Sequence, residues 1–123
     1  MRTPKPVLDR RRSIRIAEKL PFKIGLQDYE VEALTVNISV NGALCLVERE
    51  IALMTQLKIA LSLPPISKSS PQKSKILSMK GVVVRREKDA ATNKYYIAIY
   101  FSDIKPNDRK YLSQFIESRL PAA

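Results

Sequence analysis

Four arginines stand close together near the N-terminus, in the stretch RRRSIRI at residues 10–16. A guanidinium is planar and permanently charged, and it can hold two phosphate oxygens with paired hydrogen bonds. Arg11 and Arg15 are four positions apart, so on an extended or turning segment they can approach one ligand from two directions. This spacing indicates a clamp for an anionic ligand, and a solvated basic tail is the alternative interpretation.

A second polar stretch, NISVNG at residues 37–42, lies between two segments that read as strands. Asparagine, serine and glycine are typical turn residues, so the stretch taken alone predicts a turn. The Ser39 hydroxyl can also donate a hydrogen bond to a phosphate or sugar oxygen, and Gly42 allows a close approach of the backbone. The turn is therefore a candidate partner for the arginines.

The overall composition excludes several classes of chemistry. The 123 residues contain no histidine and one cysteine, Cys45, so the chain has no internal disulfide and too few soft ligands for a zinc site. Catalysis that depends on a histidine base is excluded as well. We expect neither an enzyme nor a metalloprotein.

The net charge of +10 is concentrated at the N-terminus, where residues 1–15 hold six basic residues against Asp9 alone. Such an excess favours an anionic partner, which can be a nucleotide, a nucleic acid or an acidic membrane. No apolar stretch approaches the roughly 20 residues that cross a bilayer, and the N-terminus lacks the apolar segment of a signal peptide. We therefore expect a cytoplasmic protein.

Hydrophobic periodicity predicts six strands and one helix. Alternating or β-branched segments occur at residues 22–26, 29–39, 42–47, 56–63, 76–88 and 95–101. We expect a bulge near Ala33–Leu34, a bend at Gly81 and an exposed loop at 64–75. Helical spacing follows, with Asn107 or Asp108 as the predicted N-cap.

These elements predict a mainly β fold, a small six-stranded antiparallel β-barrel, closed or split, with a C-terminal α-helix. We expect one domain at residues 10–120, preceded by a flexible basic tail at 1–9. Within the domain, residues 10–19 would form a ligand-binding arm, 20–104 the barrel and 105–120 the helix.

The two polar motifs, in this order and ahead of a barrel and a helix, resemble the PilZ domain family of bacterial cyclic di-GMP receptors. The family's signature is R-x-x-x-R followed by [D/N]-x-S-x-x-G, and here Asn37 stands 22 residues after Arg15. The segments QLKIALSLP, KGVVVRRE and YYIAIYFSDI are similar to later strands of the family. The resemblance extends from Arg10 to Leu120.

The resemblance implies that the ligand is cyclic di-GMP, bound by the side chains of Arg10, Arg11, Arg15, Asn37 and Ser39 and by the backbone at Gly42. Arginine suits both the phosphates and the guanine edge of that ligand, whereas Asn37 has one acceptor oxygen where an aspartate has two, a loss of about 1 kcal/mol. A second arginine before the motif, here Arg10, implies two stacked ligand molecules. The arm would close over the ligand and alter the interaction with an unknown downstream protein, with no further cofactor.

Three other functions are also compatible with the sequence. A nucleic-acid-binding barrel would suit the charge, but single-strand binders present aromatic platforms and the chain has no tryptophan. Tyr95, Tyr96 and Tyr100 are candidates for such a platform, and strand alternation predicts that some of them point inward. The second function is a protein-interaction module without a ligand, and the third is a basic segment that binds a membrane surface.

Overall fold

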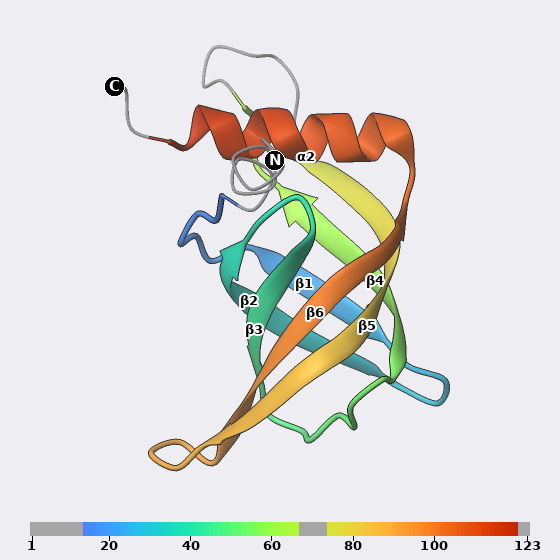
Figure 1. The fold of residues 1–123 in the computed structure, drawn as a ribbon, viewed down its shortest axis with the longest axis vertical. Helices are drawn as coiled ribbons and strands as arrows, with labels where there is room; N and C mark the ends of the chain where they lie inside the picture. Colours follow the sequence, from blue (N-terminus) through green and yellow to red (C-terminus); the bar gives the residue numbers. More distant parts are fainter. Residues whose placement is uncertain (1–13, 67–73, 121–123) are drawn as a thin grey trace, which may run out of the picture.

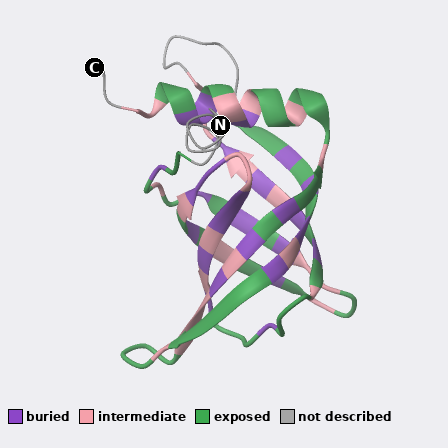
Figure 2. Ribbon diagram, in the orientation of Figure 1, coloured by how far each residue is buried: buried purple, intermediate pink, exposed green. Residues whose placement is uncertain are grey.

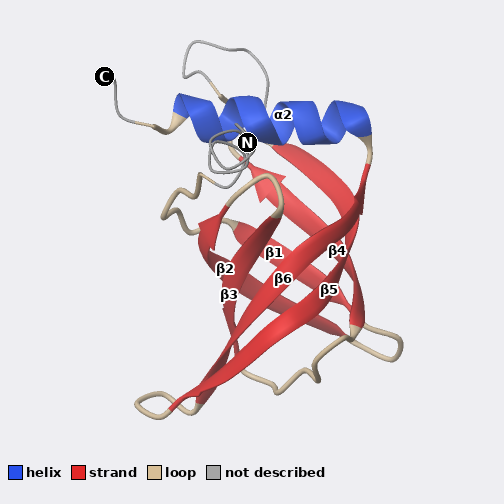
Figure 3. Ribbon diagram, in the orientation of Figure 1, coloured by secondary structure: helices blue, strands red, loops and turns tan. Residues whose placement is uncertain are grey.

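The computed structural model describes residues 14–66 and 74–120, so the predictions for residues 1–9 and for Arg10 and Arg11 lie outside the described residues. Six strands and a helix follow one another along the chain (Figure 3). They are β1 (Pro21–Gly25), β2 (Glu30–Ile38), β3 (Gly42–Val47), β4 (Gln56–Leu63), β5 (Lys75–Asp89), β6 (Lys94–Ile104) and α2 (Pro106–Ser118).

The strands form a closed barrel in the order β1-β2-β3-β6-β5-β4, and every neighbouring pair is antiparallel. Helix α2 lies across one end of the barrel (Figure 1). The predicted six-stranded barrel with a C-terminal helix is therefore confirmed, and the barrel is closed rather than split. Closure leaves no exposed sheet edge on these strands.

Buried and exposed residues alternate along the strands (Figure 2), and the buried residues are almost all apolar. The clearest example is β4, where Leu57, Ile59, Leu61 and Leu63 are all buried. Helix α2 closes the barrel mouth with Leu112, Phe115 and Ile116. The core is therefore a filled interior and leaves the outer surface and the rim for binding.

The predicted bulge in β2 exists, but its position near Ala33–Leu34 was wrong. The register of β2 against β3 shifts between Thr35 and Asn37, so Val36 is the extra residue. Thr35 and Ile38 are consequently both buried, while Leu34 remains 49% exposed. A bulge allows two residues to oppose one, which changes the face of the strand that points inward.

Strands β5 and β6 form a long hairpin that is irregular at two places. Their register shifts between Lys80 and Gly81 and again between Val83 and Arg85, which agrees with the predicted bend at Gly81. A Cβ atom at Gly81 would lie 2.8 Å from the Ile59 Cδ1 atom inside the barrel. Glycine suits this position, because a larger residue would have to push the buried isoleucine side chains aside.

Helix α2 begins earlier than predicted. Its N-cap is Lys105, which makes no side-chain capping bond, and Asn107 and Asp108 lie inside the first turn. Pro106 occupies the start of the helix because its fixed φ suits that position and it needs no N–H partner. No helix within residues 14–66 and 74–120 is long and apolar enough to cross a membrane.

Candidate functional site

The segment before β1 lies against β2 and brings the two sequence motifs together. The Ile16 N–H donates to the Ile38 carbonyl and the Ile38 N–H donates to the Ile16 carbonyl, both at 3.0 Å. This pairing sets Arg15 beside Asn37, and the Arg15 Nη1 donates to the Asn37 Oδ1 at 2.8 Å. The bulge at Val36 contributes, because it directs Ile38 inward and leaves Asn37 next to the surface.

Thr35 fastens the same segment a few residues further along. Its buried hydroxyl accepts a hydrogen bond from the Leu20 N–H at 2.9 Å and donates one to the Glu18 carbonyl. The Thr35 N–H donates to the Leu20 carbonyl at 3.0 Å. Three hydrogen bonds therefore fix residues 18–20 on β2, so the base of the predicted arm belongs to the barrel wall.

The predicted turn at residues 37–42 exists, and Ser39 stabilises it from within. The Ser39 N–H donates to the Gly42 carbonyl at 2.8 Å, and the Asn41 N–H donates to the Ser39 hydroxyl oxygen at 3.2 Å. The Ser39 hydroxyl also donates to the Gly42 carbonyl at 3.4 Å, and the residue is 1% exposed. In this structure, the Ser39 side chain therefore stabilises the turn.

The packing of β3 against β6 explains why position 42 is a glycine. A Cβ atom at this position would collide with the Ile99 carbonyl oxygen of β6. The backbone that approaches Gly42 closely is therefore that of β6. The φ angle of Gly42 is not positive. Directly across from Gly42 lies Tyr100, whose side chain points outward and is 52% exposed.

The three tyrosines of β6 differ in how far they face the core. Tyr95 is half-buried and packs against the hydrophobic core, which agrees with the expectation that some of the three point inward. Tyr96 is also half-buried, whereas Tyr100 is exposed. Tyr100 therefore places an aromatic ring on the surface beside the turn.

Helix α2 and the residue after it supply two arginines that sequence reasoning missed. The Arg109 Nη1 donates to the Asn41 Oδ1 at 3.5 Å, and the Arg119 Nε donates to both carboxylate oxygens of Glu18, at 3.1 and 3.3 Å. These contacts join residues 68 and 101 positions apart. No local sequence pattern predicts such pairings, since they depend on how the helix crosses the barrel.

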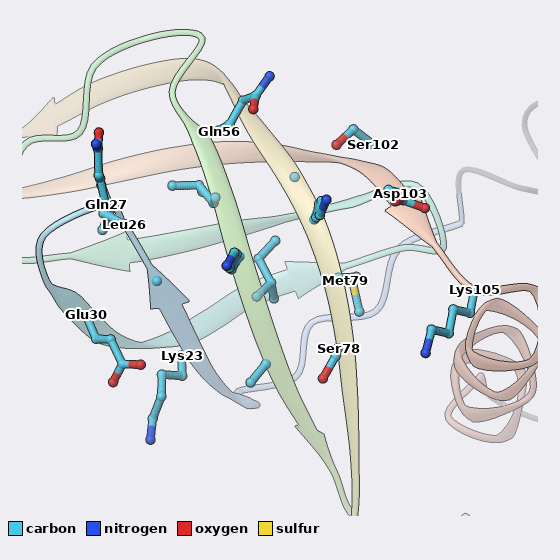
Figure 4. Close-up of a pocket in the computed structure, with 17 residues that line it drawn as sticks. Lys23, Leu26, Gln27, Glu30, Gln56, Ser78, Met79, Ser102, Asp103 and Lys105 are labelled. Atoms are coloured by element: carbon cyan, nitrogen blue, oxygen red, sulfur yellow. The ribbon is translucent and has the colours of Figure 1, made fainter.

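The described motif residues lie where the β2–β3 turn meets the segment before β1, which we call the rim. Arg15 is exposed there, Asn37 is half-buried, and Ser39 and Gly42 are buried. A groove of about 1050 Å³ lies elsewhere, along β1, β4 and β5 (Figure 4). It is lined by four lysines, including Lys58 and Lys80, which are directly opposite each other on neighbouring strands. None of Arg15, Asn37, Ser39 or Gly42 lines this groove. Among the residues that the structure describes, no cluster of acidic or cysteine side chains is placed to hold a metal ion.

Three solved structures share the fold. The inhibitor of motility MotI/DgrA of Bacillus subtilis has a TM-score of 0.74 at 21% identity over 86% of this chain and 49% of that one. The PilZ domain of YcgR from Escherichia coli, solved with cyclic di-GMP, has a TM-score of 0.61 at 14% identity over 85% and 87% of the two chains. The PlzA protein of Borreliella burgdorferi, in complex with cyclic di-GMP, has a TM-score of 0.57 at 15% identity over 97% and 58%.

The chain spans about half the length of the Bacillus structure that it matches. At these identities the likeness concerns the fold alone, and a comparison with curated protein sequences finds no significant match. The sequence model of the PilZ domain matches residues 9–118, which is most of the chain. This chain therefore belongs to the PilZ domain family.

Proposed function

We propose that the chain is a receptor for cyclic di-GMP, bound where the arginine arm meets the turn at residues 37–42. The observation that carries the proposal is the 2.8 Å hydrogen bond from Arg15 to Asn37, which joins the two motifs of the sequence. Membership of the PilZ domain family supports it. Two of the similar structures, those of YcgR and PlzA, contain this ligand.

The chemistry of the rim suits a cyclic dinucleotide. The ligand has two phosphodiester charges and two guanines, and a guanidinium has five N–H donors for such groups. Among the described residues, Arg15 donates one hydrogen bond, to Asn37, and its side chain is exposed; the guanidinium has further donors for phosphate oxygens or a guanine edge. Tyr100 adds an exposed ring beside Gly42 on which a purine can stack.

In this proposal, Asn37 does more than recognise a guanine directly. Its Oδ1 accepts the hydrogen bond from Arg15 and thereby orients the guanidinium. A carbonyl oxygen has a second lone pair, which can accept from a guanine N–H. In this proposal, Asn37 both positions Arg15 and contacts the base, while Ser39 and Gly42 shape the turn that presents them.

The proposal also covers two arginines outside the described residues and the output of the receptor. Arg10 and Arg11 close over the ligand from the arm, and Arg10 accompanies a second, stacked cyclic di-GMP molecule. The site binds without catalysis, and its output is a changed interaction with a downstream protein. Because cyclic di-GMP is an intracellular messenger, the chain acts in the cytoplasm.

Calorimetric titration with cyclic di-GMP and with a short single-stranded oligonucleotide tests the proposal. We expect the wild type to bind the dinucleotide with mild salt dependence and Arg11→Ala or Arg15→Ala to abolish that binding. Arg49→Ala is the matched control: it removes one exposed charge in the β3–β4 connection, which lies at the barrel end away from α2 (Figure 1). Oligonucleotide binding with a steep salt slope, and none to cyclic di-GMP, would contradict the proposal.

A further inference from the structure

We propose that the ion pair between Glu18 and Arg119 positions the arginine arm for ligand binding. The inference rests on the proposed function and assigns positioning roles to two residues outside both sequence motifs. It concerns the base of the arm, three residues after Arg15, and the residue that follows the end of α2.

The geometry of the pair is that of a fixed contact. The Arg119 Nε lies 3.1 Å from the Glu18 Oε1 and 3.3 Å from the Oε2, and both side chains are less than a third exposed. The Arg119 guanidinium also lies over the ring of Phe115, 4.5 Å from its centroid. Since Phe115 is completely buried on the inner face of α2, this stacking holds the guanidinium against the core.

Glu18 is held from two directions. Its backbone carbonyl accepts the hydrogen bond from the buried Thr35 hydroxyl on β2, while its carboxylate reaches Arg119 beyond α2. The two preceding anchors on the segment are the Ile16–Ile38 pairing and the Arg15–Asn37 hydrogen bond. The ion pair therefore completes a continuous set of contacts that fixes where the segment leaves the barrel.

The same helix also contacts the other half of the site, because Arg109 donates to Asn41 in the turn. Arg109 and Arg119 are ten residues apart, which corresponds to about 15 Å along a helix axis, so their contacts with the turn and with the base of the arm come from opposite parts of α2 and its end. The Arg109 contact is long, at 3.5 Å, so the Glu18–Arg119 pair is the stronger of the two. Helix α2 thereby sets the arm and the turn at a fixed separation.

Charge reversal tests the pair. Glu18→Lys and Arg119→Glu each place like charges together and should weaken cyclic di-GMP binding about 3- to 10-fold. The double variant Glu18→Lys/Arg119→Glu restores opposite charges and should recover the wild-type dissociation constant within about twofold. Glu18→Lys is especially informative, since an added positive charge would by itself favour an anionic ligand.

The Glu50–Arg86 ion pair provides matched controls. Its N–O distance is 2.9 Å, and it joins the β3–β4 connection to the β5–β6 hairpin, at the barrel end away from α2 (Figure 1). Glu50→Lys and Arg86→Glu change the net charge by the same amounts as the test variants. We expect each control to shift the dissociation constant by less than about twofold.

A second readout does not depend on the ligand. The Ile16 amide hydrogen, which is bonded to the Ile38 carbonyl, should exchange with solvent faster in both single variants and regain its protection in the double variant. Single variants that match their controls in affinity and exchange, or a double variant that does not recover, would overturn the inference. Absence of wild-type binding to cyclic di-GMP would contradict the proposed function, and the Ile16 exchange would still decide the positioning role.

Discussion

At the residue scale, the described motif positions divide into those that lie at the surface and those that shape the turn. Arg15 is exposed and donates a hydrogen bond to Asn37. Ser39 and Gly42 are buried by the turn and by β6. Substitutions at these two kinds of position should therefore differ in whether they change binding, stability or both.

Gly42→Ala should lower the free energy of unfolding by about 1–3 kcal/mol, because the new Cβ atom would collide with the Ile99 carbonyl oxygen. Denaturant titration measures this loss. Gly25→Ala is the control: its Cβ atom would lie at an ordinary 3.6 Å from the Lys58 Cβ atom, so stability should be unchanged or slightly higher. Equal stability of the two variants would contradict the role given to β6.

The sequence singled out these residues as candidates but did not separate their structural roles. The spacing of arginines and the turn chemistry of NISVNG are local features, and they predicted a site whose described residues do lie on one rim. The close approach of Ile99 to Gly42 depends on the pairing of β3 with β6. That pairing joins distant parts of the chain and leaves no local pattern.

At the element scale, the segment before β1 behaves as part of the barrel because β2 offers it hydrogen bonds. Ile38 and Thr35 both lie on the inward face of β2 on either side of the bulge at Val36. Periodicity predicted that the face changes but placed the change too early, since Leu34 and Val36 are apolar although they are exposed. Only the pairing of β2 with β3 defines the position of the bulge.

Thr35→Val should cost about 1–3 kcal/mol of stability, since the buried Leu20 N–H and Glu18 carbonyl both lose their partner on the Thr35 hydroxyl. Thermal or denaturant unfolding measures the change. Thr92→Val is the matched control, because its hydroxyl bonds to Asp89 at the surface and water can replace it. A cost at Thr35 no larger than at Thr92 would contradict the anchoring of the arm base.

The start of α2 shows why helix boundaries were harder to predict than the helix itself. The apolar spacing of Leu112, Phe115 and Ile116 predicted the helix and its buried face correctly. Asn107 and Asp108 are favourable N-cap residues, yet Pro106 begins the helix and places both inside its first turn. The sequence thus contains two signals for the start of the helix, Pro106 and the pair Asn107–Asp108, and the helix begins at the earlier one.

At the scale of the whole molecule, the closed barrel keeps Cys45 away from water. Burial raises the pKa of the Cys45 thiol from 9.0 to about 12. The unfolded chain releases this proton above pH 9, while the folded barrel retains it until about pH 12. Rising pH therefore favours the unfolded state, and this contribution to stability is lost between these two values.

Unfolding measurements at pH 7 and pH 10 test that burial. The wild type should lose about 1.4 kcal/mol more than Cys45→Ala over this interval, because one pH unit above the unfolded pKa corresponds to roughly that free energy. The comparison with Cys45→Ala removes the contribution of tyrosines and lysines, which the two proteins share. An identical pH dependence of both proteins would contradict a buried, protonated thiol.

The most direct test of the central claim, that the arm and the turn bind the ligand, is a map of backbone amide chemical shifts during a titration with cyclic di-GMP. We expect the largest changes at Arg15, Ile16 and residues 37–42, while the amides of Lys58 and Lys80 in the lysine-lined groove stay unchanged. Changes centred on that groove, with an unaffected turn, would contradict the claim.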